Sequence, residues 1–163
     1  MRQENRTRAF RPFLAAFFAL CIVLPTANHA VGQQKSRIPP MTTYQAMLDG
    51  NLEGGWVSFR NIDGRQLVYF SALQTLHCRL QEIRYSVNST ELDRQFPLVA
   101  CNPQNPFALP PDSGVEDILI RLDAGAASTV AVQVVWEDGS KSRMAVYEPC
   151  EDVGDQTCAW LLE

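Results

Sequence analysis

The sequence has few of the residues on which most catalytic and metal sites depend. It contains two histidines in 163 residues, and only His77 lies beyond the first 32. The patterns G-x-S-x-G, H-E-x-x-H and C-x2–4-C, typical of serine hydrolases, zinc peptidases and zinc-stabilised folds, do not occur. We therefore expect no catalytic residue, no metal and no cofactor, and we expect that the protein is not an enzyme.

Basic residues are also scarce, and they form no cluster after the N-terminal segment. Lys and Arg number 14 against 18 Asp and Glu, which gives a net charge of −4. Four of the basic residues lie in the first 11 positions, so residues 33–163 are more acidic than the whole chain. Nucleic acids and anionic membranes bind clustered positive charge. The composition therefore argues against both as partners.

The first 32 residues have the features of a secretory signal peptide. A basic segment precedes the apolar run Phe13–Leu24, Pro25 ends that run, and small residues allow cleavage after Ala30 or Gly32. The run is shorter than the roughly 20 residues that span a bilayer. An uncleaved anchor is one alternative, and a lipid on Cys21 is another. We expect cleavage, a secreted or periplasmic location and no membrane association afterwards.

Four cysteines follow the signal peptide, and an even number predicts two disulfides in an oxidising compartment. Three pairings are possible. We favour Cys78–Cys101 and Cys150–Cys158, because each closes a local loop. By the loop-entropy relation these bonds would contribute about 3.5 and 2.5 kcal/mol respectively. A zinc site is the rival interpretation, but the cysteine spacings differ from those of zinc folds.

Short runs of β-forming residues predict the fold. The clearest hairpin is Val130–Tyr147, in which Asp138-Gly139 supplies a tight turn, and Trp56–Leu73 repeats the pattern around Asp63-Gly64. The alternation of polar and apolar residues slips at Arg79–Gln81, which predicts a turn or a bulge. Further strands are expected at Glu82–Asn88, Phe96–Val99 and Asp117–Leu122.

Many short strands separated by turns are typical of an antiparallel β-sandwich. We predict an all-β, immunoglobulin-like β-sandwich of about seven strands, with a small β-barrel as the alternative. The sandwich would occupy residues 56–163. Residues 33–55 would form a flexible leader, in which Thr43–Leu48 makes a short helix that is closed at Gly50.

Three segments resemble a known domain. The strand Glu82–Asn88, the short strand Phe96–Leu98 and the segment Val130–Ser142 are similar to the immunoglobulin-like domain at the C-terminal end of chitobiases and β-hexosaminidases. That family continues its first strand with Asp-Gly and Pro, where this chain has Asn88-Ser89-Thr90. The chain also resembles small secreted bacterial proteins of no known function. The resemblance implies a fold and no catalytic residue, since catalysis in those enzymes lies in another domain.

Exposed aromatic side chains and grouped carboxylates are the remaining candidates for a site. Trp160 follows the last cysteine and Trp136 directly precedes a turn, so either could contact a glycan or a protein. Asp112 and Glu116 form an acidic cluster with Asp117. A second cluster around Cys150 suits a solvated turn better than a Ca²⁺ site. The candidate binding residues are therefore Trp160, Trp136, Asp112 and Glu116.

We predict a monomeric, non-catalytic binding or accessory module that recognises a protein or a glycan. One alternative is a small secreted enzyme inhibitor that would use the proline-rich, disulfide-braced loop Cys101–Ser113. A second alternative is a hydrolase with an unrecognised site, in which His77 would be the only available histidine. For His77 itself, a structural position beside a cysteine is the simpler interpretation.

Overall fold

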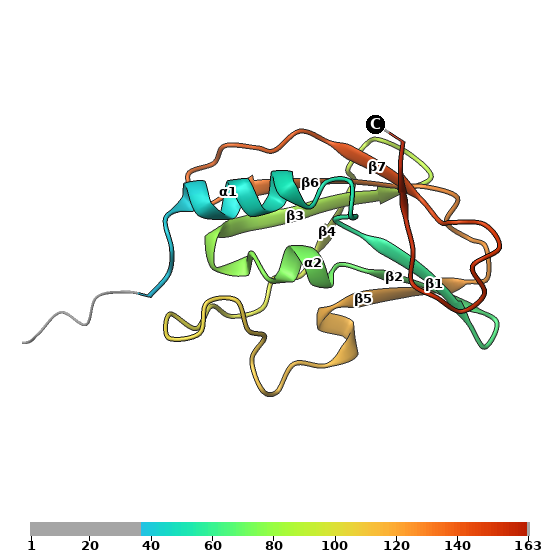
Figure 1. Ribbon diagram of the computed structural model, residues 1–163, viewed down its shortest axis with the longest axis horizontal. Coiled ribbons are helices and arrows are strands. Elements are labelled where there is room, and N and C mark those ends of the chain that lie inside the picture. The colour runs from blue at the N-terminus through green and yellow to red at the C-terminus, as the bar shows by residue number, and fades with distance from the viewer. Residues whose placement is uncertain (1–36, 163) are drawn as a thin grey trace, which may run out of the picture. The chain divides into compact units, whose positions relative to one another are not determined.

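The computed structural model describes residues 37–162, which form two antiparallel β-sheets and a few short helices (Figure 1). One sheet has the strand order β1-β2-β5, and the other has the order β4-β3-β6-β7-β8. The described residues thus form the predicted all-β antiparallel sandwich, with eight strands. The strands are β1 (Ser58–Ile62), β2 (Arg65–Tyr69), β3 (Leu80–Val87), β4 (Arg94–Phe96), β5 (Leu119–Asp123), β6 (Val130–Trp136), β7 (Ala145–Glu148) and β8 (Trp160–Leu161).

Both favoured disulfides are confirmed. Cys78 is bonded to Cys101, and Cys150 is bonded to Cys158. Two disulfides suggest an oxidising, extracytoplasmic location. The expected signal peptide, residues 1–32, lies outside the described residues. Within residues 37–162, no helix has the length and apolar character needed to cross a bilayer.

The β1–β2 hairpin forms around the predicted Asp-Gly turn. Ile62 pairs with Arg65, so Asp63 and Gly64 make up the whole turn, and both have positive φ angles of 50° and 70°. This conformation follows the twist of the strands and is most accessible to Gly, Asn and Asp. The turn therefore has the sequence that its geometry requires.

The second Asp-Gly hairpin, between β6 and β7, has a different turn. The N–H of Gly139 donates to the carbonyl of Trp136 (2.9 Å), and the N–H of Trp136 donates to the carbonyl of Ser140 (2.8 Å). Gly139 has a positive φ of 82°, as expected of the glycine that closes a three-residue loop. The hairpin is confirmed, although β7 itself begins only at Ala145.

The prediction that one strand covers Gln66–Leu73 is wrong in its second half. Strand β2 ends at Tyr69, and helix α2 (Ser71–Gln74) and the 3₁₀ helix η1 (His77–Arg79) follow. Phe70, Leu73 and Leu76 are all buried. They are three positions apart, which is the spacing of one helix face and not of a strand.

The irregularity predicted at Arg79–Gln81 is confirmed. Strand β3 pairs with β6 along its length, but the register shifts between Leu80 and Glu82. Beyond this bulge, Ile83 and Tyr85 face the core, as alternation along a half-buried strand predicts. Ser86 departs from this alternation: it is buried, and its hydroxyl donates to the carbonyl of Ser89 (2.6 Å).

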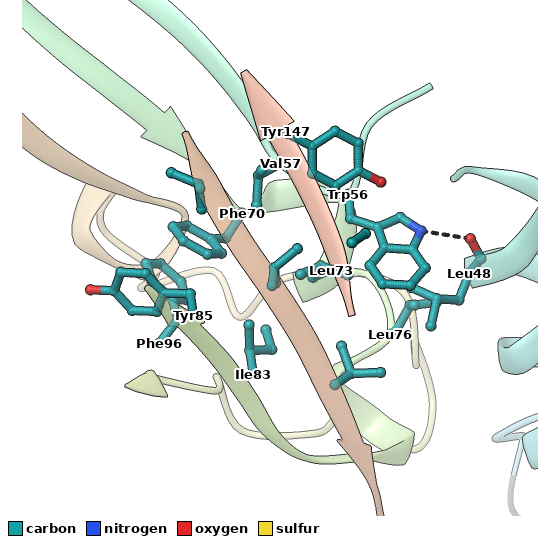
Figure 2. Packing of buried hydrophobic residues seen from close by; sticks show 14 of the residues in the cluster. Leu48, Trp56, Val57, Phe70, Leu73, Leu76, Ile83, Tyr85, Phe96 and Tyr147 are labelled. Carbon is teal, nitrogen blue, oxygen red and sulfur yellow. Dashed lines mark hydrogen bonds between the residues drawn. The ribbon is translucent and has the colours of Figure 1, made fainter. Parts of the chain in front are cut away.

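The short helix expected in the leader is longer and contributes to the core. Helix α1 (Met41–Gly50) buries Tyr44 and Leu48, which lie one turn apart on the same face. The indole N–H of Trp56 donates to the carbonyl of Leu48 (2.8 Å), so a core side chain caps the helix end (Figure 2). The folded core therefore draws on residues before the expected boundary at 56.

A second aromatic donor holds the segment that follows α1. Tyr147 in β7 is fully buried, and its hydroxyl donates to the carbonyl of Leu52 (2.8 Å). Burial disfavours the phenolate and raises the pKa of Tyr147 to about 12. In Figure 2, Trp56 and Tyr147 lie side by side between the strands and the end of α1. These two side chains therefore join the helix to the sheet.

Candidate functional site

Trp160 is the most exposed large aromatic residue among the described residues, with 62% of its surface accessible. It lies in β8, the edge strand next to β7, where it pairs directly with Glu148. Directly opposed residues of an antiparallel pair share one face of the sheet. The indole and the Glu148 carboxylate are therefore neighbours on a face that solvent reaches. Leu161, one residue on, packs partly buried against the core instead.

Trp160 lines a polar hollow of about 660 Å³. The hollow lies between the tail of the chain, strands β1 and β2 and the loop between β5 and β6, and we call it the Trp160 hollow. Its other lining residues are Asn61, Gln66, Gly125, Ala127, Ser128, Glu148, Pro149, Cys150 and Glu151.

One wall of the Trp160 hollow is the acidic loop between β7 and β8. The Cys150–Cys158 disulfide closes this loop. Arg60 in β1 donates from Nε to the carbonyl of Asp155 (2.8 Å), and its guanidinium also pairs with the Asp155 carboxylate (3.4 Å). The N–H and carbonyl of Cys158 each bond to Phe59 in β1 (2.9 Å). The wall is therefore fixed by covalent, ionic and backbone contacts.

The opposite wall is the loop between β5 and β6, and a buried amide holds it in place. The side chain of Gln66 donates to the carbonyl of Ala127 (3.0 Å) and accepts from the N–H of the same residue (2.7 Å). Gln66 is 1% exposed, and these contacts use both ends of its amide. Gln66 is therefore a positioning residue, and its burial keeps it from direct contact with a ligand.

A second amide holds the same loop from its other side. Asn88 has a positive φ of 57°, a conformation that Asn tolerates better than most residues. Its Oδ1 accepts from the N–H of Ser128 (2.8 Å) and of Thr129 (3.1 Å), and its Nδ2 donates to the carbonyl of Ala126 (2.7 Å). The loop is thus preorganised before any ligand arrives.

The polar groups that remain free in the hollow are mostly acceptors. Within residues 37–162, the carboxylates of Glu148 and Glu151 and the amide of Asn61 have no hydrogen-bond or ion-pair partner. An ionised carboxylate only accepts hydrogen bonds, and an amide both donates and accepts. The arrangement suits a ligand with several hydroxyl or N–H donors and an apolar face for the indole.

A second hollow among the described residues is apolar. It has a volume of about 340 Å³ and lies between α1 and α2, beside Met47, Leu48 and Leu73. The indole N–H of Trp56 and the hydroxyl of Thr75 line it, but both already bond to backbone carbonyls. This hollow offers few polar groups to orient a ligand, so we place the candidate site at Trp160.

Comparison of the chain with models of protein families, with curated proteins and with solved structures found no match. The resemblance to the immunoglobulin-like domain of chitobiases and β-hexosaminidases therefore stays a prediction.

The four candidate binding residues do not form one site. Trp136 is 3% exposed and belongs to the core, so its expected role in binding is not supported. It occupies the inward-facing series of β6 that begins at Val130, and residues of α1, including Gln45, lie beside it. Asp112 and Glu116 are both exposed, and Asp112 lines a separate small hollow on the proline-rich segment.

Most of the residues that line the Trp160 hollow were not predicted from the sequence. Asn61 comes from β1 and Ser128 from the loop between β5 and β6, and nothing in the local sequence brings them to the tail. Gln66 could have been noticed, because it is a polar residue at an inward position of β2. Trp160 itself was predicted, because it stands beyond the last cysteine.

His77 is buried, and its contacts are compatible with a structural position beside a cysteine. Its side chain is 4% exposed. Nδ1 lies 2.5 Å from the carbonyl of Gln74, and Nε2 lies 3.6 Å from the sulfur of Cys78. It lies in η1 and not in a strand, because the chain is helical there. Its contacts are with a backbone carbonyl and a disulfide, and neither is a catalytic partner.

Proposed function

We propose that the protein is a non-catalytic binding module of an oxidising, extracytoplasmic compartment, and that it recognises a neutral glycan in the Trp160 hollow. One observation carries the proposal: Trp160 is 62% exposed beside two carboxylates that have no partner among the described residues. An exposed indole beside polar groups can stack on the apolar face of a ligand while those groups bind its polar edge.

The chemistry of sugars fits this arrangement. A pyranose ring has an apolar C–H face that can stack on an indole, and its hydroxyl groups donate to carboxylates and amides. Glu148, Glu151 and Asn61 supply such groups around Trp160. The carboxylates would repel an anionic sugar, which favours a neutral glycan.

The test is a binding titration with neutral hexose and N-acetylhexosamine oligomers. We expect the wild-type chain to bind at least one of these series. Trp160→Ala should weaken that binding by at least about tenfold, because an aromatic stacking partner and its buried area are lost. Glu148→Gln should weaken it less, since a hydrogen-bond acceptor remains.

The matched control is Leu162→Ala. Leu162 is 46% exposed and lies two residues from Trp160, but it does not line the hollow. Its substitution should leave glycan affinity unchanged. Equal affinity of the wild type and Trp160→Ala, or no binding of any neutral oligomer, would contradict the proposal.

Enzyme inhibition is the second candidate, and the bracing of the proline-rich loop favours it. The disulfide fixes the loop at Cys101, and the ring of Phe107 stacks on Tyr44 with centroids 5.1 Å apart. Phe107 remains 37% exposed. Inhibition assays against a panel of extracellular hydrolases, repeated with Phe107→Ala, test this candidate: inhibition that the substitution abolishes would favour it over glycan binding.

A further inference from the structure

His77, Cys78 and Cys101 bring three metal-binding atom types to one place. A ring nitrogen of His77 and the two sulfur atoms all lie within 4.8 Å of one another. The first two residues are adjacent in η1, and the disulfide brings Cys101 to them from the proline-rich loop. Thiolate sulfur and imidazole nitrogen are the donors that zinc and copper(I) prefer.

The tautomer of His77 can be assigned from its hydrogen bond. Nδ1 lies 2.5 Å from the carbonyl oxygen of Gln74, and a carbonyl oxygen can only accept. Nδ1 therefore carries the proton, and in the neutral ring Nε2 carries a lone pair. A metal-binding histidine typically has its second nitrogen held by a backbone carbonyl or a carboxylate. His77 has this arrangement.

The second ring nitrogen of His77 lies next to the disulfide. Among the described residues, the contact of Nε2 is with the sulfur of Cys78, at 3.6 Å. That sulfur belongs to a disulfide and has no proton to donate. His77 is 4% exposed, so little water reaches its ring. A ring nitrogen with little access to solvent and both sulfur atoms are thus gathered at one place.

We propose that reduction of the Cys78–Cys101 disulfide converts this cluster into a binding site for a thiophilic metal ion such as Zn²⁺, with His77 Nε2 and the two thiolates as ligands. A dithiol would supply two electrons and two protons, would itself be oxidised to a disulfide, and would leave both cysteines as thiols. Binding of Zn²⁺ then releases the two thiol protons to solvent. Water completes the tetrahedral coordination.

The distances suit this change. Tetrahedral Zn²⁺ with bonds of about 2.3 Å to sulfur and about 2.0 Å to nitrogen requires a sulfur–nitrogen separation of about 3.6 Å. His77 Nε2 and the sulfur of Cys78 are already 3.6 Å apart. Only the sulfur of Cys101 has to move, and this residue is exposed, so both reductant and ion can reach it.

The experiment uses a chain in which Cys21, Cys150 and Cys158 are replaced by Ser, so that no other thiol remains. The protein is reduced with a dithiol, freed of the reductant under anaerobic conditions and titrated with Zn²⁺ against a chromophoric chelator. We expect one ion per reduced chain and none per oxidised chain. Co²⁺ in place of Zn²⁺ should give thiolate-to-metal charge-transfer bands.

His77→Gln in the same background tests the nitrogen ligand. It should weaken Zn²⁺ binding by at least about tenfold, since even the loss of an outer hydrogen bond to a ligand has this effect. Circular dichroism monitors the fold at each step. A reduced, folded chain that binds no Zn²⁺, or binding that His77→Gln leaves unchanged, would overturn the proposal. A chain that unfolds on reduction and does not refold with Zn²⁺ would also overturn it.

Discussion

The two disulfides close loops of different kinds. The Cys78–Cys101 bond lies against a buried polar centre, in which Gln74 donates from one amide nitrogen to the carbonyls of Pro97 and Asp117 (2.7 Å each). The Cys150–Cys158 bond closes a surface loop. The first loop is thus also held at Pro97 by a buried side chain, whereas the second is also held by the backbone pairing of Cys158 with Phe59 and by the exposed Arg60–Asp155 ion pair. This difference is why we infer a redox-dependent site at the first and a ligand-binding wall at the second.

The largest expected effect is the loss of the longer cross-link. The double substitution Cys78→Ser with Cys101→Ser should lower the free energy of unfolding by about 3.5 kcal/mol, because the unfolded chain regains the entropy of a long loop. Urea denaturation monitored by tryptophan fluorescence measures this change. Glycan binding in the Trp160 hollow should persist, and its loss would show that the two regions are coupled.

The buried hydroxyl of Tyr147, which holds the segment after α1, titrates at high pH. Its pKa is about 12 in the folded chain against an ordinary value of 10.0. The unfolded chain therefore loses this proton first, so stability is full below pH 10 and falls as the pH rises towards 12. The two pH units correspond to about 2.7 kcal/mol. Tyr147→Phe should remove this alkaline component of the fall.

Denaturation at pH 9 and at pH 11 measures the contribution of Tyr147, with Tyr85→Phe as the control. Tyr85 is 8% exposed, and no hydrogen bond of its hydroxyl is found among the described residues. Between pH 9 and pH 11, the free energy of unfolding of Tyr85→Phe should decrease by as much as that of the wild type. An equal loss in Tyr147→Phe would contradict the assignment.

The shorter cross-link should matter less for stability and more for binding. Cys150→Ser with Cys158→Ser should cost about 2.5 kcal/mol, because the loop is shorter. Since this loop forms a wall of the Trp160 hollow, glycan affinity should fall as well. The same glycan titration should be carried out with both double variants. Only Cys150→Ser with Cys158→Ser should have a lower affinity than the wild type.

The hydrogen bonds of Gln74 should contribute about 2 kcal/mol to the free energy of unfolding. Gln74→Met keeps the side-chain volume but leaves the carbonyls of Pro97 and Asp117 without a donor in a buried site. Thermal unfolding measures the loss. Gln156→Met, an exposed position, is the control and should have no effect. A Gln74→Met variant as stable as the wild type would mean that the disulfide alone holds the loop.

The smallest effect is expected from the ion pair on the second loop. Asp155→Asn removes a surface partner of Arg60 at 3.4 Å, and solvent screens such pairs. The melting temperature should remain unchanged within error. A clear decrease would show that the second loop is held more firmly than its exposed contacts suggest.

The sequence was informative where local chemistry decides the structure. Both Asp-Gly turns, the bulge near Leu80 and the pairing of cysteines into local loops follow from backbone preference and chain proximity. The segment after Tyr69 was misassigned. Its buried residues Phe70, Leu73 and Leu76 recur every three positions, which indicates a helix, but the segment was interpreted as a continuation of the strand. The immunoglobulin-like subtype stays a prediction.

The site was harder to predict, because packing between distant segments creates it. A tryptophan that precedes a turn can lie at the rim of a sandwich or in its core. Trp136 lies in the core because α1 packs beside it, and this helix is nearly 90 residues earlier in the sequence. The walls of the Trp160 hollow come from both sheets. The amides of Gln66 and Asn88 act through hydrogen bonds to residues about 40 to 60 positions away, and the sequence does not indicate those partners.

The course of the tail has a consequence for aggregation. Cys158 pairs with Phe59 at the edge of one sheet, and Trp160–Leu161 pairs with β7 at the edge of the other. An uncovered strand edge offers free N–H and carbonyl groups to a second chain. Five residues, 158–162, occupy such positions on both sheets. Detachment of this short segment would therefore expose two edges at once and convert a self-contained sandwich into a template for intermolecular β-pairing.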